Sequence, residues 1–151
     1  DWLLGLVGRW RYSSVSLMPD GSRCESRGVE VVRSIGELWI MAELSANVPG
    51  SQSMMQCVLS LGFDASAGEF VGSWIGSPMA HMFVYRGRLD ADRRVLTLDC
   101  SGPGMDDAAT TVQYRDVIEV ASDGVRRHVS RMRLPDGAWS ELMRAEYMRD
   151  A

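Results

Sequence analysis

Ten short stretches in which apolar and polar residues alternate run through the whole chain, separated by turn signals. An alternation with a period of two residues is typical of a β-strand with one buried face. In the first stretch, from Gly8 onward, Trp10 and Tyr12 share one face, whereas Arg9 and Arg11 share the other. No helical period is sustained anywhere. The sequence therefore predicts an all-β fold, with one short helical turn over Trp2–Val7.

Turn signals between these stretches predict how the strands are connected. Pro19-Asp20-Gly21 and Pro135-Asp136-Gly137 are predicted tight turns, because Pro presets φ and Gly accepts a positive φ, and Ser122-Asp123-Gly124 is a hairpin signal. We expect ten strands, at about residues 8–15, 23–35, 38–45, 55–63, 70–74, 81–89, 95–100, 112–120, 125–134 and 139–149. Consecutive strands with short connections favour a single up-and-down antiparallel barrel, because closure leaves no unpaired edge.

Length, charge and cysteine content narrow the class of protein. A chain of 151 residues is expected to form one domain, residues 1–151. The formal net charge of −4 argues against a nucleic-acid surface, and no apolar run reaches the ~18 residues of a membrane span. Cys24, Cys57 and Cys100 lie far apart, which favours free thiols in a reducing compartment such as the cytoplasm. The sequence begins at Asp1 rather than Met, so a preceding signal peptide stays an open alternative.

An ordered series of short motifs resembles one barrel family. Gly8-Arg9-Trp10 is similar to the Gly-x-Trp motif of lipocalin-like (calycin-type) barrels, in which the Trp closes one barrel end. Further motifs make the series resemble an uncharacterised bacterial family of lipocalin-like domains of unknown function: Gly62-Phe63-Asp64, Phe70-Val71-Gly72-Ser73-Trp74, Tyr85-Arg86-Gly87-Arg88-Leu89-Asp90, Tyr114-Arg115-Asp116-Val117 and Glu146-Tyr147-Met148-Arg149. The resemblance implies a barrel of about ten strands and no established activity. Phe63 departs from the Tyr expected in its motif.

A barrel of this size is either filled by side chains or holds one small ligand. The sequence is rich in large, adaptable side chains, with ten Met and five Trp. We expect the ligand-binding residues, if the barrel is hollow, to be Trp10, Tyr12, Trp74, His81, Phe83, Tyr85, Tyr114, His128, Met132 and Trp139.

The polar residues expected inside leave several alternatives open. His81 and His128, the two histidines, would orient a polar ligand head, or one would bind a haem iron. Asp116 shares a face with Tyr114 and needs a partner if it is buried. Four arginines are candidate partners, and an Arg–Tyr–His cluster would anchor a carboxylate-headed ligand: Arg27, Arg33, Arg126 and Arg144. The orientations of Glu30 and Glu43 stay ambiguous.

No motif indicates catalysis. The chain lacks Lys, a Gly-x-Ser-x-Gly elbow, a glycine-rich phosphate loop and a His-Glu-x-x-His sequence, so we assign no catalytic residue, metal or cofactor. The function we expect is non-catalytic binding of a small lipophilic ligand. The alternatives are a filled barrel that acts as a structural or homodimerisation module, a haem-binding barrel, and an enzyme that uses His81 or Asp116 as acid or base.

Overall fold

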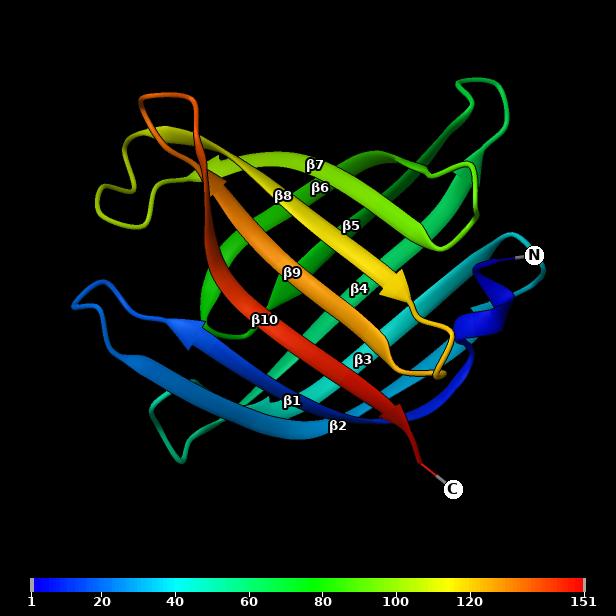
Figure 1. Cartoon of the computed structure of the whole chain (residues 1–151), viewed down its shortest axis with the longest axis horizontal. Helices are drawn as coiled ribbons and strands as arrows, with labels where there is room; N and C mark the ends of the chain where they lie inside the picture. The colour runs from blue at the N-terminus through cyan, green and yellow to red at the C-terminus, as the bar shows by residue number, and fades with distance from the viewer. Residues whose placement is uncertain (1, 151) are drawn as a thin grey trace.

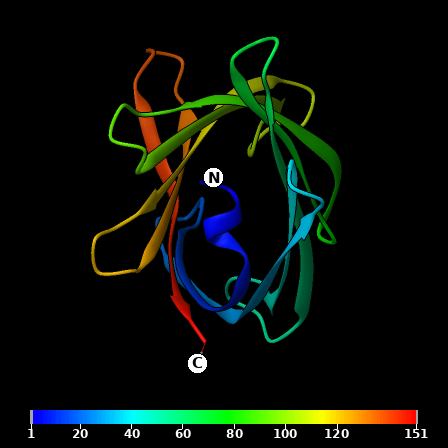
Figure 2. The same cartoon turned by 90° about the vertical axis from the view of Figure 1, so that its right-hand side faces the viewer.

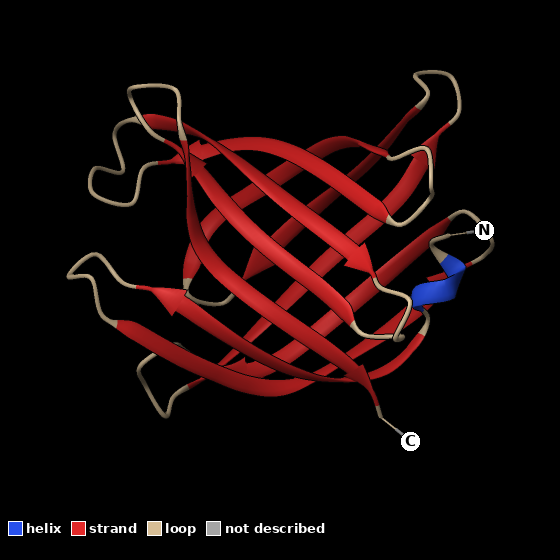
Figure 3. Ribbon diagram, in the orientation of Figure 1, coloured by secondary structure: helices blue, strands red, loops and turns tan. Residues whose placement is uncertain are grey.

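The computed structural model describes residues 2–150 as ten antiparallel strands preceded by one 3₁₀ turn (Figures 1 and 3). This confirms the all-β prediction and the short N-terminal helical turn. The elements are η1 (Leu4–Leu6), β1 (Gly8–Leu17), β2 (Arg23–Ile35), β3 (Trp39–Asn47), β4 (Met54–Asp64), β5 (Glu69–Gly76), β6 (Met79–Leu89), β7 (Val95–Pro103), β8 (Thr111–Val120), β9 (Arg126–Arg133) and β10 (Trp139–Arg149).

The strands close into one up-and-down barrel, as predicted. Each strand pairs with its neighbours in the chain, and β1 also pairs with β10 from Trp10↔Arg149 to Ser16↔Met143. This last pairing joins the two ends of the sheet, so that one face of every strand points to the barrel axis. Figure 2 shows the resulting ring of strands from one end. None of the described residues forms a helix that is long and apolar enough to cross a membrane.

Three irregularities interrupt the ladder, and the first is a register shift between Trp74 and Gly76 where β5 pairs with β6. The pairing of β6 with β7 runs only from Arg86↔Asp99 to Leu89↔Leu96, so the first part of β6 has no ladder partner on that side. In β10 the register with β9 shifts between Glu141 and Met143, as it does at a β-bulge. All three irregularities lie toward the end of the barrel that holds the β5–β6 and β9–β10 connections.

The three Asp-Gly turns form by one mechanism. In each, the aspartate Oδ1 accepts a hydrogen bond of 2.9 Å from the backbone N–H two residues later: Asp20 with Ser22, Asp123 with Val125, and Asp136 with Ala138. The glycine that follows each aspartate has φ between 81° and 90°. Only glycine takes this conformation at little cost, which explains why these sequences signal tight turns.

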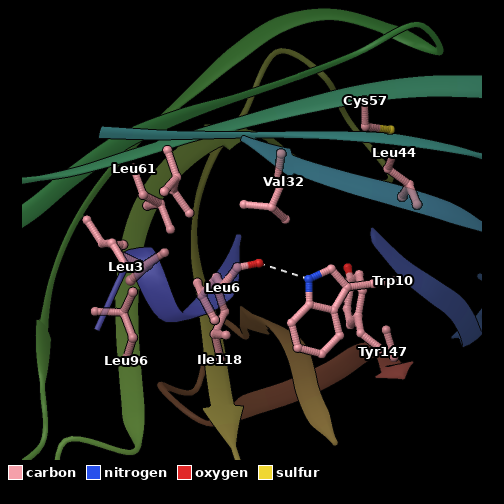
Figure 4. Close-up of a cluster of buried hydrophobic side chains, with 14 of the residues drawn as sticks. Leu3, Leu6, Trp10, Val32, Leu44, Cys57, Leu61, Leu96, Ile118 and Tyr147 are labelled. Carbon is pink, nitrogen blue, oxygen red and sulfur yellow. Dashed lines mark hydrogen bonds between the residues drawn. The ribbon is translucent and has the colours of Figure 1, made fainter. Parts of the chain in front are cut away.

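Element η1 plugs one end of the barrel (Figure 2). The side chains of Leu3 and Leu6 are buried, and Trp10 Nε1 donates a hydrogen bond of 2.9 Å to the Leu6 carbonyl oxygen (Figure 4). Arg149 donates to the Val7 carbonyl at 2.7 Å and also to the Gly5 carbonyl. Hydrogen bonds from the first and the last strand of the barrel, β1 and β10, therefore hold the plug against the core.

The plugged end contains the apolar core. Inward side chains from β2, β3, β4, β7 and β8 surround the plug and are almost fully buried: Val32, Ile40, Leu61, Leu96, Leu98 and Ile118 (Figure 4). The three cysteines are free thiols, as expected, and of these Cys57 is buried while Cys24 and Cys100 are partly exposed.

Truncation of the plug tests its contribution to stability. Leu6 is 2% exposed, and Leu4 in the same turn is 37% exposed. We expect Leu6→Ala to lower the free energy of unfolding by about 2–5 kcal/mol, because it leaves a cavity in a packed core. Leu4→Ala is the matched control, with an expected change within about 0.5 kcal/mol. Equal effects of the two variants in urea unfolding would show that the plug does not seal the core.

Candidate functional site

The inward face differs between the two halves of the barrel. Around the plug, inward side chains are buried. Toward the opposite end, Cys57 on β4 and Tyr114 on β8 are buried, but seven other inward side chains on β4–β7, β9 and β10 are only half-buried: Leu59, Trp74, His81, Phe83, Cys100, Met132 and Met143. Solvent therefore reaches the interior from the end formed by the β1–β2, β3–β4, β5–β6, β7–β8 and β9–β10 connections, at the left of Figure 1. We call this region the open half.

Aromatic rings line one wall of the open half. The ring of Phe83 lies 5.9 Å from Trp74, 4.6 Å from His81 and 5.7 Å from Tyr114, measured between ring centroids. Tyr114 is held in place because its hydroxyl donates to the Pro103 carbonyl at 2.6 Å. Such a wall offers large apolar contact area at low cost in side-chain entropy.

Gly102 provides space for this wall from β7. A Cβ atom at this position would lie 2.5 Å from Phe83 Cε1 and 3.1 Å from His81 Nε2. The Nε2 atom of His81 is buried and has no hydrogen-bond partner among the described residues. It therefore lies close to β7 at Gly102.

A polar cluster lies deeper in the open half, between β6, β8 and β9. Tyr85 donates a hydrogen bond of 2.6 Å to Asp116 Oδ2, and His128 Nε2 lies 3.3 Å from the same oxygen. The His128 contact is within ion-pair distance, but Nε2 lacks a well-aligned hydrogen bond. The side chains of Asp116 and His128 are still 13% and 14% exposed. This cluster thus combines buried polar groups with some access for solvent.

The charge state of Asp116 follows from its partners. Burial raises the pKa of Asp116, but interactions with His128, Tyr85 and Ser130 outweigh burial, so that this pKa lies below the ordinary value of 3.8. Asp116 is therefore an anion at neutral pH. Burial, and then the Asp116 charge, raise the pKa of Tyr85 well above 10.0, so Tyr85 stays a neutral donor.

The thiols near this region are poor nucleophiles. Burial, followed by the charges of Asp116 and Asp99, raises the pKa of Cys100 to about 12. Burial and the charge of Glu30 raise the pKa of Cys57 to about 11. Because the thiolate is the reactive species, neither cysteine is activated for covalent catalysis. Within residues 2–150 there is also no group of three or more His, Cys, Asp and Glu side chains placed to hold a metal ion.

A second pair of charges is sealed near the plug. Arg126 donates to Glu30, and their side chains are 4% and 6% exposed. The guanidinium carbon of Arg126 lies 4.6 Å from the centroid of the Trp10 ring and 3.9 Å from that of Tyr147. Arg126 is thus enclosed by a carboxylate and two aromatic faces, where cation–π attraction is favourable.

The expectation that an arginine pairs with Asp116 is wrong. Arg126, the one buried candidate, is taken by Glu30. The other three candidates lie on the outer surface with acidic partners there: Arg27 with Glu25, Arg33 with Glu43, and Arg144 with Glu141. The structure also resolves the ambiguous acids, because Glu30 points inward and Glu43 outward.

The ten residues proposed from the sequence fall into three places. Seven lie in or beside the open half, where the structure brings them together: Trp74, His81, Phe83, Tyr85, Tyr114, His128 and Met132. Trp10 and Tyr12 are inward but buried, Trp10 beside the plug and Tyr12 against Tyr147. Sequence reasoning did not place Leu59, Cys100 or Met143 in the site, although Leu59 and Cys100 follow the alternation of their strands.

Trp139 is on the outer face, unlike the other nine. Met143, Ala145 and Tyr147 are the inward positions of β10, and the bulge between Glu141 and Met143 reverses the alternation before them. Trp139 consequently pairs with the outward Arg133, and the Arg115 guanidinium lies 4.5 Å from its ring. A single inserted residue changes which face a side chain occupies, and the sequence carries no clear signal of it.

Two depressions lie on the outer surface, and the smaller one borders the open half, because Cys100 and Tyr114 are among its lining residues. One of about 380 Å³ lies beside Trp139 and is lined by Arg86, Arg115 and Arg133 among others. The other, of about 710 Å³, follows β10, β1 and β2 and is lined by residues of both charges, including Arg23, Glu25 and Arg144. Their lining is more polar and more exposed than the interior wall.

The buried ion pair predicts a large difference between two charge-neutralising variants. We expect Glu30→Gln to lower the free energy of unfolding by about 3–5 kcal/mol, because it leaves the Arg126 charge sealed and unpaired. Glu43→Gln removes the partner of Arg33 in an exposed pair and should cost at most about 1 kcal/mol. Chemical denaturation of both variants measures the difference, and a Glu30→Gln loss as small as the control would contradict the sealed pair.

The lowered pKa of Asp116 predicts a pH-dependent stability difference. A carboxyl group whose pKa is lower in the folded chain stabilises the fold above its unfolded pKa, and this contribution is lost as the pH falls through the folded pKa. The stability gap between the wild type and Asp116→Asn should therefore be full above about pH 5 and shrink below about pH 4. A stability difference between the two proteins that is the same in both pH ranges, measured by urea titration, would contradict the assigned ionisation of Asp116.

Comparisons with known proteins identify a family. A family model described as "Protein of unknown function (DUF1579)" matches residues 1–149. No curated protein matches the chain significantly. Among solved structures, a redesigned β-barrel, mFAP1, bound to DFHBI, is similar with 12% identity and a TM-score of 0.44 over 97% of each chain; so distant a likeness carries no argument about the site. The family match covers nearly the whole chain, and the protein therefore belongs to the DUF1579 family of proteins of unknown function.

Proposed function

We propose that the protein binds one small, mainly apolar molecule in the open half of the barrel and does not transform it. One observation carries this proposal: seven inward side chains of the open half, Trp74, Phe83 and Met132 among them, are half-buried, whereas the inward positions around the plug are sealed. The lining is aromatic and sulfur-rich, with Trp74, Phe83 and Met132, and has a few polar groups at one side. Apolar walls with a small number of fixed polar groups are typical of small-molecule sites.

The protonation states support binding over catalysis. Tyr85 and Cys100 have raised pKa values and stay neutral, and Asp116 is held as an anion by its partners. An acid or base suited to neutral pH would have a pKa near 7. The Asp116–His128 contact is the arrangement on which an enzymatic alternative would rest, and the nearby Cys100 thiol has a raised pKa and stays protonated.

Haem binding is a weaker alternative at His81. Iron ligation needs an imidazole nitrogen that faces open space along the barrel axis. The Nε2 atom of His81 is buried and lies close to β7, where a Cβ on Gly102 would be 3.1 Å away. We therefore favour an apolar ligand over a porphyrin.

A homodimerisation module is the second candidate function, and the unpaired part of β6 favours it. Met79, Met82 and Val84 are 46–61% exposed along a stretch of strand that has no ladder partner on one side. Unpaired apolar strand edges tend to associate. A stable dimer that does not respond to any lipophile would support this candidate in place of ligand binding.

We also propose that the barrel is lipocalin-like and that the protein is in a reducing compartment. The Trp10 side chain packs at the plugged end, which supports the resemblance of Gly8-Arg9-Trp10 to the lipocalin-like motif. The three free thiols support a reducing compartment such as the cytoplasm.

Titration with an uncharged apolar dye tests ligand binding. N-phenyl-1-naphthylamine should bind with one saturable site and quench tryptophan emission by energy transfer. Trp74 is the tryptophan in the wall of the open half, so Trp74→Phe should reduce this quenching without abolishing dye binding. Trp39→Phe changes an outward-facing ring and is the matched control. No saturable response to this dye or to a panel of uncharged lipophiles would refute the proposal.

A space-filling variant provides a second readout. Gly102→Val should push the Phe83 ring into the open half and weaken dye binding by about tenfold or more. Gly5→Ala is the control, because a Cβ there meets no atom within 4 Å. Unchanged affinity in Gly102→Val would place the dye elsewhere, for example in a surface depression.

A further inference from the structure

The charges inside the barrel are few and can be counted. Among the described residues, the inward-facing ionisable groups that are fully charged at neutral pH are Glu30, Asp116 and Arg126. Apart from the two histidines, the interior therefore carries two carboxylates and one guanidinium, which sum to a net charge of −1.

The one interior guanidinium is not available to a ligand. Arg126 is 4% exposed, donates to Glu30, and lies between the rings of Trp10 and Tyr147 near the plug. A carboxylate-headed ligand would have to displace Glu30 from a sealed position, leaving a second carboxylate without its partner. Burying an unpaired carboxylate is unfavourable.

Asp116 is the charge that faces the open half. Its side chain keeps 13% exposure beside the half-buried His128, and Tyr85 and His128 both contact Oδ2, while Ser130 is a further hydrogen-bond partner of the carboxylate. The Nε2 atom of His128 lacks a hydrogen-bond partner. The polar wall of the site therefore presents one anionic acceptor and one imidazole with an unmet hydrogen bond.

We propose that the open half selects apolar ligands whose head group is cationic or is an uncharged hydrogen-bond donor, such as an amine, alcohol or amide, and rejects carboxylates. The inference rests on the proposed function and names its ligand class. Asp116 is the specificity-determining residue: it accepts a hydrogen bond from the head group and repels an anion. Like charges at short range in a poorly solvated site interact strongly, so one carboxylate suffices for this selection.

Three ligands with one alkyl chain and different head groups test the proposal. Decylamine, decanol and decanoate displace N-phenyl-1-naphthylamine from the wild-type protein at about pH 8, where the amine is cationic and the acid anionic. Decanoate should bind at least about tenfold more weakly than decanol, and decylamine at least as tightly as decanol. Concentrations stay below those at which the ligands form micelles.

Two variants assign the selection to Asp116. Asp116→Asn should bring decanoate to within about threefold of decanol. Asp99→Asn removes the same charge from the outer surface, where Asp99 pairs with Arg115, and should leave the wild-type ranking unchanged. If Asp116→Asn does not fold, His128→Gln is the second variant. It removes the neighbouring imidazole and should increase the preference for decylamine over decanoate.

The outcomes separate this inference from the proposed function. Dye binding with decanoate equal to or tighter than decanol, or a ranking unaffected by Asp116→Asn, would overturn the inference and leave ligand binding intact. Dye binding that none of the three ligands displaces would also overturn it, because the head group would then not occupy the site. Failure of the dye and of all three ligands to bind would refute both.

Discussion

Closure of the sheet by β1 and β10 is the constraint on which the rest of the structure depends. The pairing runs from Trp10↔Arg149 to Ser16↔Met143 and gives every strand two neighbours. Once the ring is closed, each strand must turn one of its faces toward the axis, and alternation along the strand determines which residues are inside. The buried and half-buried residues of the site are consequences of this geometry and not of any local motif.

The plug divides the closed barrel into two unequal halves. Leu3, Leu6 and Trp10 fill one end, and the buried residues around them leave no accessible wall. At the other end, the described residues form no helical element like η1 between the strands. Several inward side chains there keep contact with solvent. The asymmetry comes from six residues at the N-terminus, because the strands themselves continue through both halves.

The sequence was sufficient for the fold and for most of the wall of the site. Alternation and turn residues determine local structure, so the ten strands, the closed barrel and the inward positions of β6, exemplified by His81, Phe83 and Tyr85, follow from it. Trp139 does not follow, because a bulge between Glu141 and Met143 reverses the alternation and bulges depend on the neighbouring strand. The partner of Asp116 does not follow either. Which side chains meet across the interior depends on the register and tilt of strands that are distant in the chain.

The positions of the interior charges, more than their number, decide which ligand charge the proposed site would accept. A buried ion pair is weak support for stability, since an apolar pair of similar size is often equally stable. The Arg126–Glu30 pair has a different consequence. It holds the one interior guanidinium of the described residues against Trp10 and Tyr147, and Glu30 neutralises the charge of that guanidinium within the core. Had Glu30 pointed outward like Glu43, Arg126 would be free to receive a carboxylate, and the barrel would suit an anionic ligand. Because the pairing is internal, Arg126 does not offset the charge of Asp116, which lies beside His128 in the open half.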